Sequence, residues 1–285
     1  MKKSISVWSF PFEWSLERKL AVAREAGFEG FEIDLTEQGD VSLSSTPDDL
    51  REVRGKIEGA GLQVSGLATG LYWGANAASA DERQRQKAEE ILRCQIECAM
   101  RLGVDAVLVV PGSVGVDFIP GSEVVPYTAV ELRARAFLQA AIPFAKKSKV
   151  KLCVENVWNK FLLSPVEMRN FIDGFQSESV RSYFDVGNVL STGYPEHWIA
   201  ALQHRIHRVH FKDYRRSVGT VDGFCDLLSG DVNWPAVMRE LHRAGYSGWV
   251  AAEMIPPVPF YKYCPEVLIH NTSRAMDAIL ALPID

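Results

Sequence analysis

Three carboxylates and one imidazole close four successive short hydrophobic segments in the second half of the chain. They are Glu155 in Lys-Leu-Cys-Val-Glu, Asp185 in Ser-Tyr-Phe-Asp, His210 in Arg-Val-His and Glu253 in Val-Ala-Ala-Glu. Taken singly, each acid has a simpler interpretation as a helix N-cap or a surface charge, and Asp185 could form a turn with the Val-Gly-Asn that follows it. A lone histidine is likewise more often a packing residue than a ligand. The repetition over four successive segments instead favours one shared site.

Three carboxylates held close together repel one another unless a cation balances their charge. Oxygen-rich ligation with one imidazole suits Mn²⁺, Mg²⁺, Co²⁺ or Zn²⁺, and four protein ligands would leave two octahedral positions for adjacent substrate oxygens. No thiolate stands at these positions, which argues against a structural zinc site. The pattern therefore predicts a divalent metal ion bound by Glu155, Asp185, His210 and Glu253.

The segments that carry these groups belong to a regular alternation of short strand-like runs and longer stretches of helical period. Such alternation is typical of an α/β fold. Helical patterns end at Gly27, Gly61, Gly103 and Gly245, where a left-handed C-cap fits, and feed directly into strands. The strands are predicted at residues 4–8, 30–35, 63–67, 106–110, 151–156, 181–185, 206–211 and 249–253.

Eight such units in a chain of 285 residues match the size of a closed (β/α)8 TIM barrel. An open doubly wound sheet would usually show a glycine-rich phosphate turn after its first strand, but Ser-Phe-Pro-Phe follows Trp8. No linker or break in composition divides the sequence, so we expect a single domain spanning residues 1–285. Longer connections at 68–80, 111–128 and 213–231 follow strands, which is where such barrels place function.

Composition narrows the possible partners. The 31 basic and 36 acidic residues give a formal net charge of −5, which makes nucleic acid and anionic membranes unlikely partners. The uncharged window at residues 60–80 carries polar residues and four glycines, and the hydrophobic stretch near the start is too short for a signal peptide. Five scattered cysteines without a CxxC motif favour a reducing compartment, so we expect a cytoplasmic protein.

The second half of the chain resembles the xylose isomerase-like barrel superfamily of sugar isomerases and epimerases. Among its members, the L-xylulose 5-phosphate (L-ribulose 5-phosphate) 3-epimerases and the ketose 3-epimerases are the most similar. The first half of the chain resembles the family only in its alternation of strand-like and helical segments. The segments that carry the resemblance are Val-Glu155-Asn, Phe-Asp185-Val-Gly-Asn188, Val-His210-Phe-Lys-Asp213, Gly230-Asp-Val-Asn-Trp234 and Gly245-Tyr-Ser-Gly-Trp-Val-Ala-Ala-Glu253-Met.

The resemblance implies a metal-dependent epimerase or isomerase of carbohydrate metabolism, with manganese among the metals expected. Glu155, Asp185, His210 and Glu253 would bind the metal, and the two glutamates would also be the catalytic acid and base. Proton removal next to a carbonyl needs a stabilised enediolate, which a chelated metal provides. Two carboxylates on opposite faces would give 3-epimerisation, whereas one base working on one face would give aldose–ketose isomerisation. The sequence leaves both open.

Further residues are candidates for binding a sugar or sugar phosphate. Asn188 stands where some family members carry a substrate-binding histidine, and Lys212, Arg215 and Arg216 form a basic cluster suited to phosphate or hydroxyl groups. We expect Asp213 to pair with one of these bases. Three tryptophans near strand ends could pack against sugar C–H faces, although core packing is the simpler role for each of them: Trp8, Trp73 and Trp158.

Three other functions remain open at the level of sequence. A lyase of the same family, such as an inosose dehydratase, would share the first half-reaction and then expel a hydroxyl group. An endonuclease IV-like nuclease needs histidines spread over the barrel, but none occurs before His197 and the chain is acidic. A non-catalytic sugar-binding barrel is the third possibility. The family resemblance further implies a homodimer or homotetramer.

Overall fold

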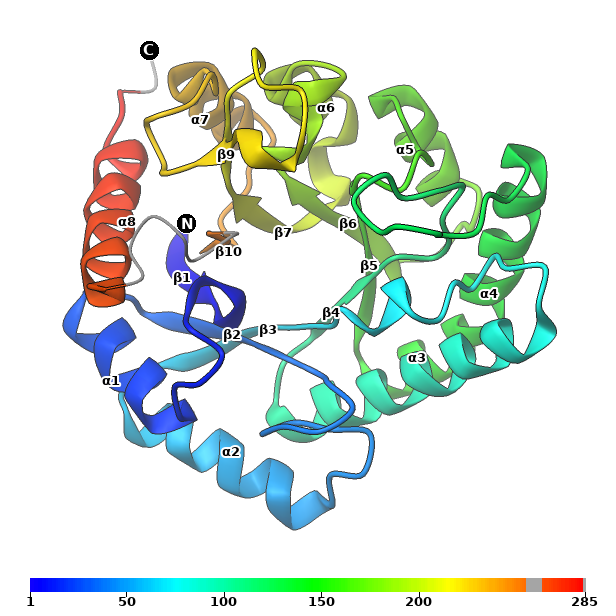
Figure 1. The fold of residues 1–285 in the computed structure, drawn as a ribbon, viewed down its shortest axis with the longest axis horizontal. Helices are drawn as coiled ribbons and strands as arrows, with labels where there is room; N and C mark the ends of the chain where they lie inside the picture. Colours follow the sequence, from blue (N-terminus) through cyan, green and yellow to red (C-terminus); the bar gives the residue numbers. More distant parts are fainter. Residues whose placement is uncertain (255–262, 284–285) are drawn as a thin grey trace.

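The computed structural model describes residues 1–254 and 263–283. Within these residues, eight parallel strands close into a barrel that is surrounded by helices, which confirms the expected (β/α)8 TIM barrel (Figure 1). Neighbouring strands pair in chain order, and the last strand returns to pair with the first. The barrel strands are β1 (Lys2–Ser6), β2 (Gly30–Asp34), β3 (Gln63–Ala68), β4 (Ala106–Val109), β5 (Lys151–Glu155), β6 (Val180–Asp185), β7 (Ile206–Phe211) and β10 (Trp249–Ala252).

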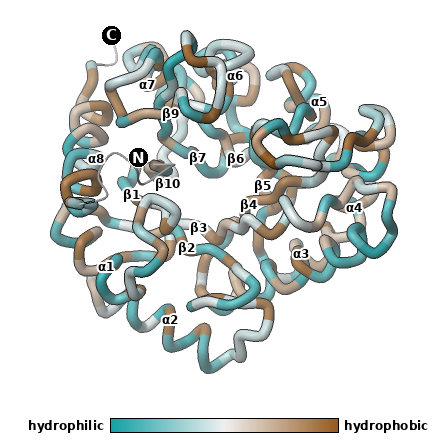
Figure 2. Tube along the Cα trace, viewed as in Figure 1, coloured by the Kyte–Doolittle hydropathy of each residue, from teal (hydrophilic) through white to brown (hydrophobic). Residues whose placement is uncertain are grey.

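The outer helices begin and end at residues whose chemistry suits those positions. Ser15, Thr46, Asp81, Ser164 and Asn233 each accept a backbone N–H of the first helical turn through the side-chain oxygen. Hydrophobic side chains of these helices face the strands, and Figure 2 shows hydrophilic segments on the outer ring, for example along α2. The helices are α1 (Leu16–Glu25), α2 (Pro47–Gly59), α3 (Glu82–Leu102), α4 (Tyr127–Ser148), α5 (Pro165–Asp173), α6 (Pro195–Leu202), α7 (Trp234–Arg243) and α8 (Pro265–Leu280).

The first strand lies two residues earlier than the sequence predicts. Instead of residues 4–8, β1 covers Lys2–Ser6, and Val7–Ser9 form a short 3₁₀ helix. The reason is local, because the Ser6 side chain accepts the backbone N–H of Trp8 and starts this turn at the top of the strand. Trp8 is thereby placed on the rim of the barrel rather than in the sheet.

The long connection after β7 forms a small hairpin, β8 (Asp213–Tyr214) with β9 (Phe224–Cys225), that the sequence analysis did not predict. Its anchor is Asp213, which is buried and accepts the N–H groups of Tyr214, Leu228 and Val232 and the indole N–H of Trp234. The expected pairing of Asp213 with Lys212, Arg215 or Arg216 is therefore wrong. The backbone N–H groups of the loop need acceptors, and they donate to the carboxylate of Asp213 instead.

Among the described residues, no helix combines the length and the hydrophobicity that crossing a bilayer requires.

Candidate metal and catalytic site

The four predicted metal ligands meet at the mouth of the barrel. Glu155 ends β5, Asp185 ends β6, His210 lies near the end of β7 and Glu253 follows β10. One ligand atom from each residue lies within 4.8 Å of the other three, and all four residues are buried. Parallel strands of a barrel bring their carboxyl ends to one face, which is why these four positions converge.

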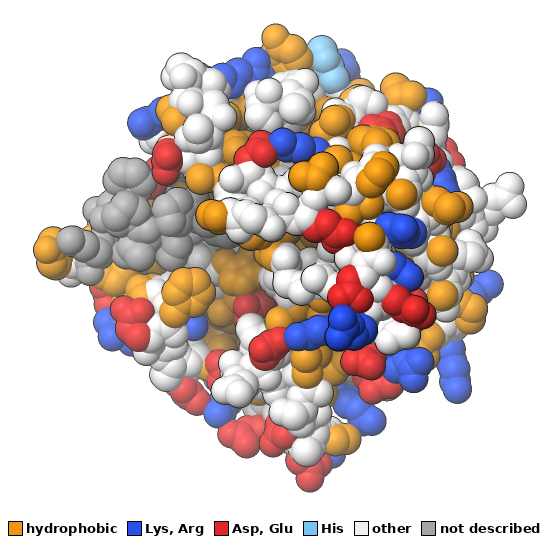
Figure 3. All heavy atoms as spheres, turned by 45° about the vertical axis from the view of Figure 1, so that its right-hand side comes forward, with side chains coloured by type: hydrophobic (Ala, Val, Ile, Leu, Met, Phe, Trp, Pro, Cys, Tyr) orange, Lys and Arg blue, Asp and Glu red, His pale blue; other side chains and the backbone are white. Residues whose placement is uncertain are grey.

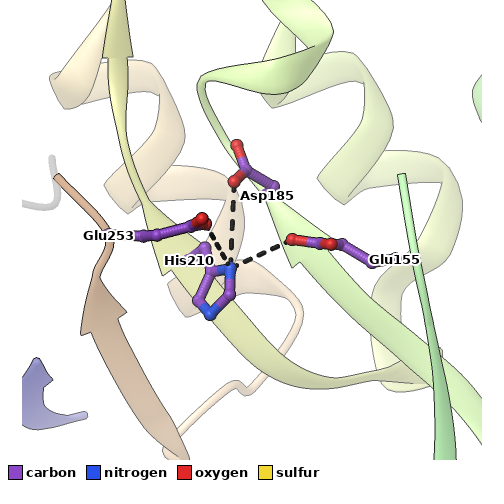
Figure 4. Close-up of side chains that lie close together, drawn as sticks. All are labelled: Glu155, Asp185, His210 and Glu253. Atoms are coloured by element: carbon purple, nitrogen blue, oxygen red, sulfur yellow. Dashed lines mark hydrogen bonds and ion pairs between the residues drawn. The ribbon is translucent and has the colours of Figure 1, made fainter. Parts of the chain in front are cut away.

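The imidazole of His210 turns its Nδ1 atom toward the three carboxylates (Figure 4). Nδ1 lies 3.0 Å from Oε1 of Glu155, 2.9 Å from Oε2 of Glu253 and 3.8 Å from Oδ2 of Asp185. Figure 4 also shows that Glu155 and Glu253 approach this atom from opposite sides. The two glutamates therefore flank a common point in the cavity.

The donor set fits a divalent cation. Oδ2 of Asp185 and Oε2 of Glu253 are buried and accept no well-aligned hydrogen bond. The ammonium group of Lys212 lies 3.2 Å and 2.9 Å from these two atoms and balances part of their charge. A fourth buried carboxylate, Glu32, contacts the same histidine. Fully ionised, the four carboxylates outnumber the single ammonium group by three charges, an excess that a bound cation would reduce.

The two glutamates differ in acidity. Burial raises the pKa of Glu155 to about 7, and the nearby charges of Glu253 and Asp185 add to this effect against the opposing influence of His210. Burial also disfavours the ionised form of Glu253, but the positive charges of Lys212 and His210 outweigh it and hold the pKa of Glu253 at about 2. Near neutral pH, Glu155 is therefore divided between its protonated and ionised forms, whereas Glu253 is ionised.

Asp185 divides its two oxygens between the turn and the cluster. Its Oδ1 accepts the backbone N–H of Asn188 at 2.7 Å, so the turn expected from Asp-Val-Gly-Asn is present. Its backbone is held by Asn156, which accepts the Asp185 N–H at 2.9 Å and donates to the Asp185 carbonyl at 2.8 Å. These contacts leave Oδ2 directed at His210 and Lys212. Asn156 stands in the motif Val-Glu155-Asn, but its role in holding Asp185 was not predicted from the sequence.

Gly187 allows β6 and β7 to approach each other just above their ends. A Cβ atom at Gly187 would lie 2.8 Å from Cβ of Lys212 and 2.9 Å from its backbone carbonyl carbon and oxygen. Since backbone cannot move aside as a flexible side chain can, a larger residue would push Lys212 away from Asp185. The glycine is thus required by close approach, and its backbone φ of −75° is ordinary.

A cavity of about 580 Å³ opens above the cluster, and Glu155 and Glu253 form part of its floor. Figure 3 shows hydrophobic side chains in and around a hollow on this face of the molecule. Of the seven residues expected to bind substrate, five line the cavity, and they are Trp8, Trp73, Trp158, Asn188 and Lys212.

Arg216 does not line the cavity. Its guanidinium group donates to the Gly193 carbonyl at 3.1 Å and lies over the ring of Tyr194. The neighbouring Arg215 donates to the Ser229 carbonyl. The expected basic cluster is therefore divided, because only Lys212 points into the barrel.

Two of the lining tryptophans are fixed by hydrogen bonds from their indole N–H groups. Trp8 donates to Oδ2 of Asp34 at 2.8 Å, and Trp158 donates to the Asn188 carbonyl at 2.9 Å. Trp73 packs edge-on against Phe118. Their ring faces and edges form hydrophobic walls around the polar floor.

Glu32 and Tyr183, which lie behind His210 in the barrel interior, were not predicted from the sequence as site residues. Glu32 lies 3.0 Å from Nε2 of His210, and the Tyr183 hydroxyl donates to Glu32. The available signal was an acid in the middle of the otherwise hydrophobic run Gly-Phe-Glu-Ile, where a charged residue needs a partner.

Comparison with known proteins shows to which family this chain belongs. The sequence model of the family described as xylose isomerase-like TIM barrel matches residues 20–270. An uncharacterized protein of Methanocaldococcus jannaschii is 27% identical over 186 residues, a stretch that covers 62% of this chain and 60% of that protein. The match thus spans less than two thirds of the relative's length.

Three solved structures share the fold over nearly the whole chain. An L-ribulose 3-epimerase superimposes with a TM-score of 0.79 at 20% identity, covering 98% of this chain and 94% of the other. A D-psicose 3-epimerase studied with D-fructose gives 0.78 at 15%, covering 99% and 100%. A protein called IOLI, whose structure holds a zinc atom, gives 0.79 at 17%, covering 99% and 98%. At these identities the likeness establishes a common fold.

Proposed function

The chain belongs to the xylose isomerase-like TIM barrel family, and from this premise we propose that it is a metal-dependent ketose 3-epimerase. One observation carries the proposal: Glu155 and Glu253 reach the same point from opposite sides, on the floor of one cavity. That arrangement suits removal of a proton from one face of a planar intermediate and its return to the other. The epimerases among the structural neighbours support the assignment by analogy.

Epimerisation at a carbon next to a carbonyl requires a base, an acid and stabilisation of the enediolate that forms between the two proton transfers. Glu155, Asp185, His210 and Glu253 would hold a Mn²⁺, Mg²⁺, Co²⁺ or Zn²⁺ ion, which when bound would polarise the substrate carbonyl. Glu253 is the proposed base that takes the proton from one side of the substrate. Glu155, which approaches from the opposite side, is the proposed acid that returns one there.

The lining of the cavity favours a ketose without a phosphate group. Among the described residues that line it, Lys212 is the only cation, and its ammonium group is already paired with Glu253 and Asp185. Three acids line the same cavity. In the adjoining cavity, Nζ of Lys160 lies 2.6 Å from Oδ1 of Asp117 and is paired as well. A phosphate dianion would enter without an unpaired cation to bind it, so a neutral sugar fits better.

The remaining cavity residues would orient the sugar. Trp8, Trp73 and Trp158 are proposed to pack against its C–H faces, and the amide of Asn188 is proposed to contact a hydroxyl group. Arg216, directed elsewhere, would reach a substrate only by leaving the Gly193 carbonyl.

The five cysteines are free thiols, which supports the proposed cytoplasmic location.

Proton exchange with solvent tests the reaction directly. The protein is loaded with Mn²⁺ or Co²⁺, incubated with pentuloses and hexuloses in heavy water, and freed of metal before deuterium is located by NMR. We expect deuterium at carbon three of both epimers. Deuterium at carbon one would indicate an isomerase instead, and loss of a hydroxyl group a lyase. Metal-loaded protein that exchanges no proton of these ketoses and forms no product from them would refute the epimerase and favour a sugar-binding barrel.

A further inference from the structure

The fourth buried carboxylate, Glu32, lies on the far side of His210 from the other proposed metal ligands. While Nδ1 of the imidazole faces the cluster, Nε2 lies 3.0 Å from Oε1 and 3.1 Å from Oε2 of Glu32. Glu32 and His210 are both fully buried in the barrel interior. A buried acid beside an imidazole affects both ring nitrogens. The hydrogen bond that one nitrogen makes determines whether the other carries a proton or a free lone pair.

Irregularities in two pairs of strands fall at the residues that build this contact. The register between β2 and β3 shifts between Phe31 and Glu32, and the register between β6 and β7 shifts between Ser182 and Tyr183. Irregularities of this kind re-aim a side chain relative to the regular pleat. Glu32 and Tyr183 meet inside the barrel, where the Tyr183 hydroxyl donates to Oε2 of Glu32. The ring centroids of Tyr183 and His210 lie 4.6 Å apart.

Gly66 on β3 leaves the space that the pair occupies. A Cβ atom at this position would lie 2.7 Å from the hydroxyl oxygen of Tyr183 and 3.0 Å from Oε2 of Glu32. Both distances are shorter than side chains normally tolerate. The backbone of four strands, β2, β3, β6 and β7, thus accommodates a single hydrogen-bonded series, Tyr183 to Glu32 to His210.

We propose that Glu32 is a positioning residue for the metal site, which fixes His210 in the tautomer with a proton on Nε2 and a free lone pair on Nδ1. The inference rests on the proposed function, since it requires that a cation binds among Glu155, Asp185, His210 and Glu253. Glu32 accepts the Nε2 proton, so Nδ1 is the atom left to bind the cation. Tyr183 holds Glu32 in place by donating to its second oxygen.

The first test needs no variant. In protein labelled with ¹⁵N-histidine and loaded with Zn²⁺, long-range ¹H–¹⁵N correlation spectra report which ring nitrogen carries the proton, with His210 assigned from a His210→Gln spectrum. We expect a protonated Nε2 and a metal-bound Nδ1. A metal-bound Nε2, or a proton on Nδ1, would overturn the proposal, and so would protein that takes up no divalent cation.

The second test is Glu32→Gln, whose amide can donate to Nε2 and so favours the wrong tautomer. We expect Mn²⁺ affinity, measured by isothermal titration calorimetry, to fall roughly 10- to 100-fold. The matched control is Asp34→Asn, which alters a half-buried acid of β2 that accepts the Trp8 indole N–H and does not contact His210. The control should bind Mn²⁺ within about twofold of the native protein.

Equal affinities for the native protein and Glu32→Gln would overturn the positioning role while leaving the proposed reaction intact. The reverse result is equally clear. Protein that shows the expected tautomer and the loss of affinity, yet exchanges no substrate proton, would refute the epimerase and retain Glu32 as a residue that positions a metal ligand.

Discussion

Nζ of Lys212 lies 2.9 Å from Oε2 of Glu253, inside the mouth of the barrel. Both side chains are buried, and the ammonium group also lies 3.2 Å from Oδ2 of Asp185. A cation this close stabilises ionised Glu253 and lowers its pKa. The sequence indicated a substrate contact for Lys212, and the contacts observed indicate that it also sets the acidity of a neighbouring carboxylate.

We predict that Lys212→Met shifts the acidic limb of the pH profile of kcat/KM to higher pH. Glu253 must be ionised to act as the base, so activity falls as the pH drops through its pKa. Removing the ammonium group raises that pKa, and the limb should move upward by roughly 1 to 3 units. Initial rates at saturating metal between pH 3 and pH 9 test this: the native limb, near pH 2, lies below this range, whereas the limb of the variant should enter it. Lys87→Met, which alters an exposed pair with Glu37, should leave the profile in place.

Glu253→Gln should keep the fold and, at saturating metal, the bound cation, but lose proton transfer. The amide retains an oxygen and nearly the same shape, yet it cannot take a proton, so kcat should fall by roughly 100- to 10,000-fold. Turnover is measured together with circular dichroism and metal content. Glu58→Gln, an exposed acid of α2, serves as the control. Near-normal turnover by Glu253→Gln would contradict the assignment of the base.

Asp185→Asn should separate the two roles of this side chain. The amide oxygen can still accept the Asn188 N–H, so the turn should survive, but the charge at Oδ2 is lost. Because altering a residue that only supports a ligand costs 10- to 100-fold in affinity, loss of a charged ligand should cost roughly 100-fold or more. Mn²⁺ titration monitored by electron paramagnetic resonance provides the measurement. Unchanged affinity would exclude Asp185 from the metal site.

A free ketose should be a better substrate than its terminal phosphate ester. No unpaired cation among the described lining residues can balance the dianion, and we expect kcat/KM to favour the neutral sugar by roughly 10-fold or more. Coupled assays on matched pairs of ketose and ketose phosphate decide this. Val221→Lys, which places a cation on the cavity wall, should narrow the preference. A preference of the native protein for the phosphate ester would contradict the proposal that the cavity suits a neutral sugar.

Gly187→Ala should destabilise the protein by about 1–3 kcal/mol, because its Cβ atom would meet the backbone of Lys212. Gly55→Ala is the matched control, since it lies in the interior of α2 with no atom near the added methyl group. It should stabilise the protein by about 0.5–1 kcal/mol through the loss of backbone freedom in the unfolded chain. Urea unfolding measures both free energies, and equal effects would argue against the close approach.

Much of the architecture could be predicted from the sequence because its causes are local. Alternation of strand and helix periods, with glycine at helix ends, is set by residues a few positions apart, and it predicts eight strands that the structure confirms. The convergence of Glu155, Asp185, His210 and Glu253 also follows, since any barrel of parallel strands gathers its carboxyl ends. Even the two-residue error in β1 has a local cause in the Ser6 side chain.

The partners of individual polar side chains were decided only by the tertiary structure. Glu32 contacts Tyr183 and His210, which lie 151 and 178 residues away, through irregularities in strand register that leave no mark in the sequence pattern. Asp213 is bound by loop N–H groups instead of a neighbouring base. The direction in which a side chain points depends on register and on distant backbone groups that need partners, and both exist only once the chain has folded.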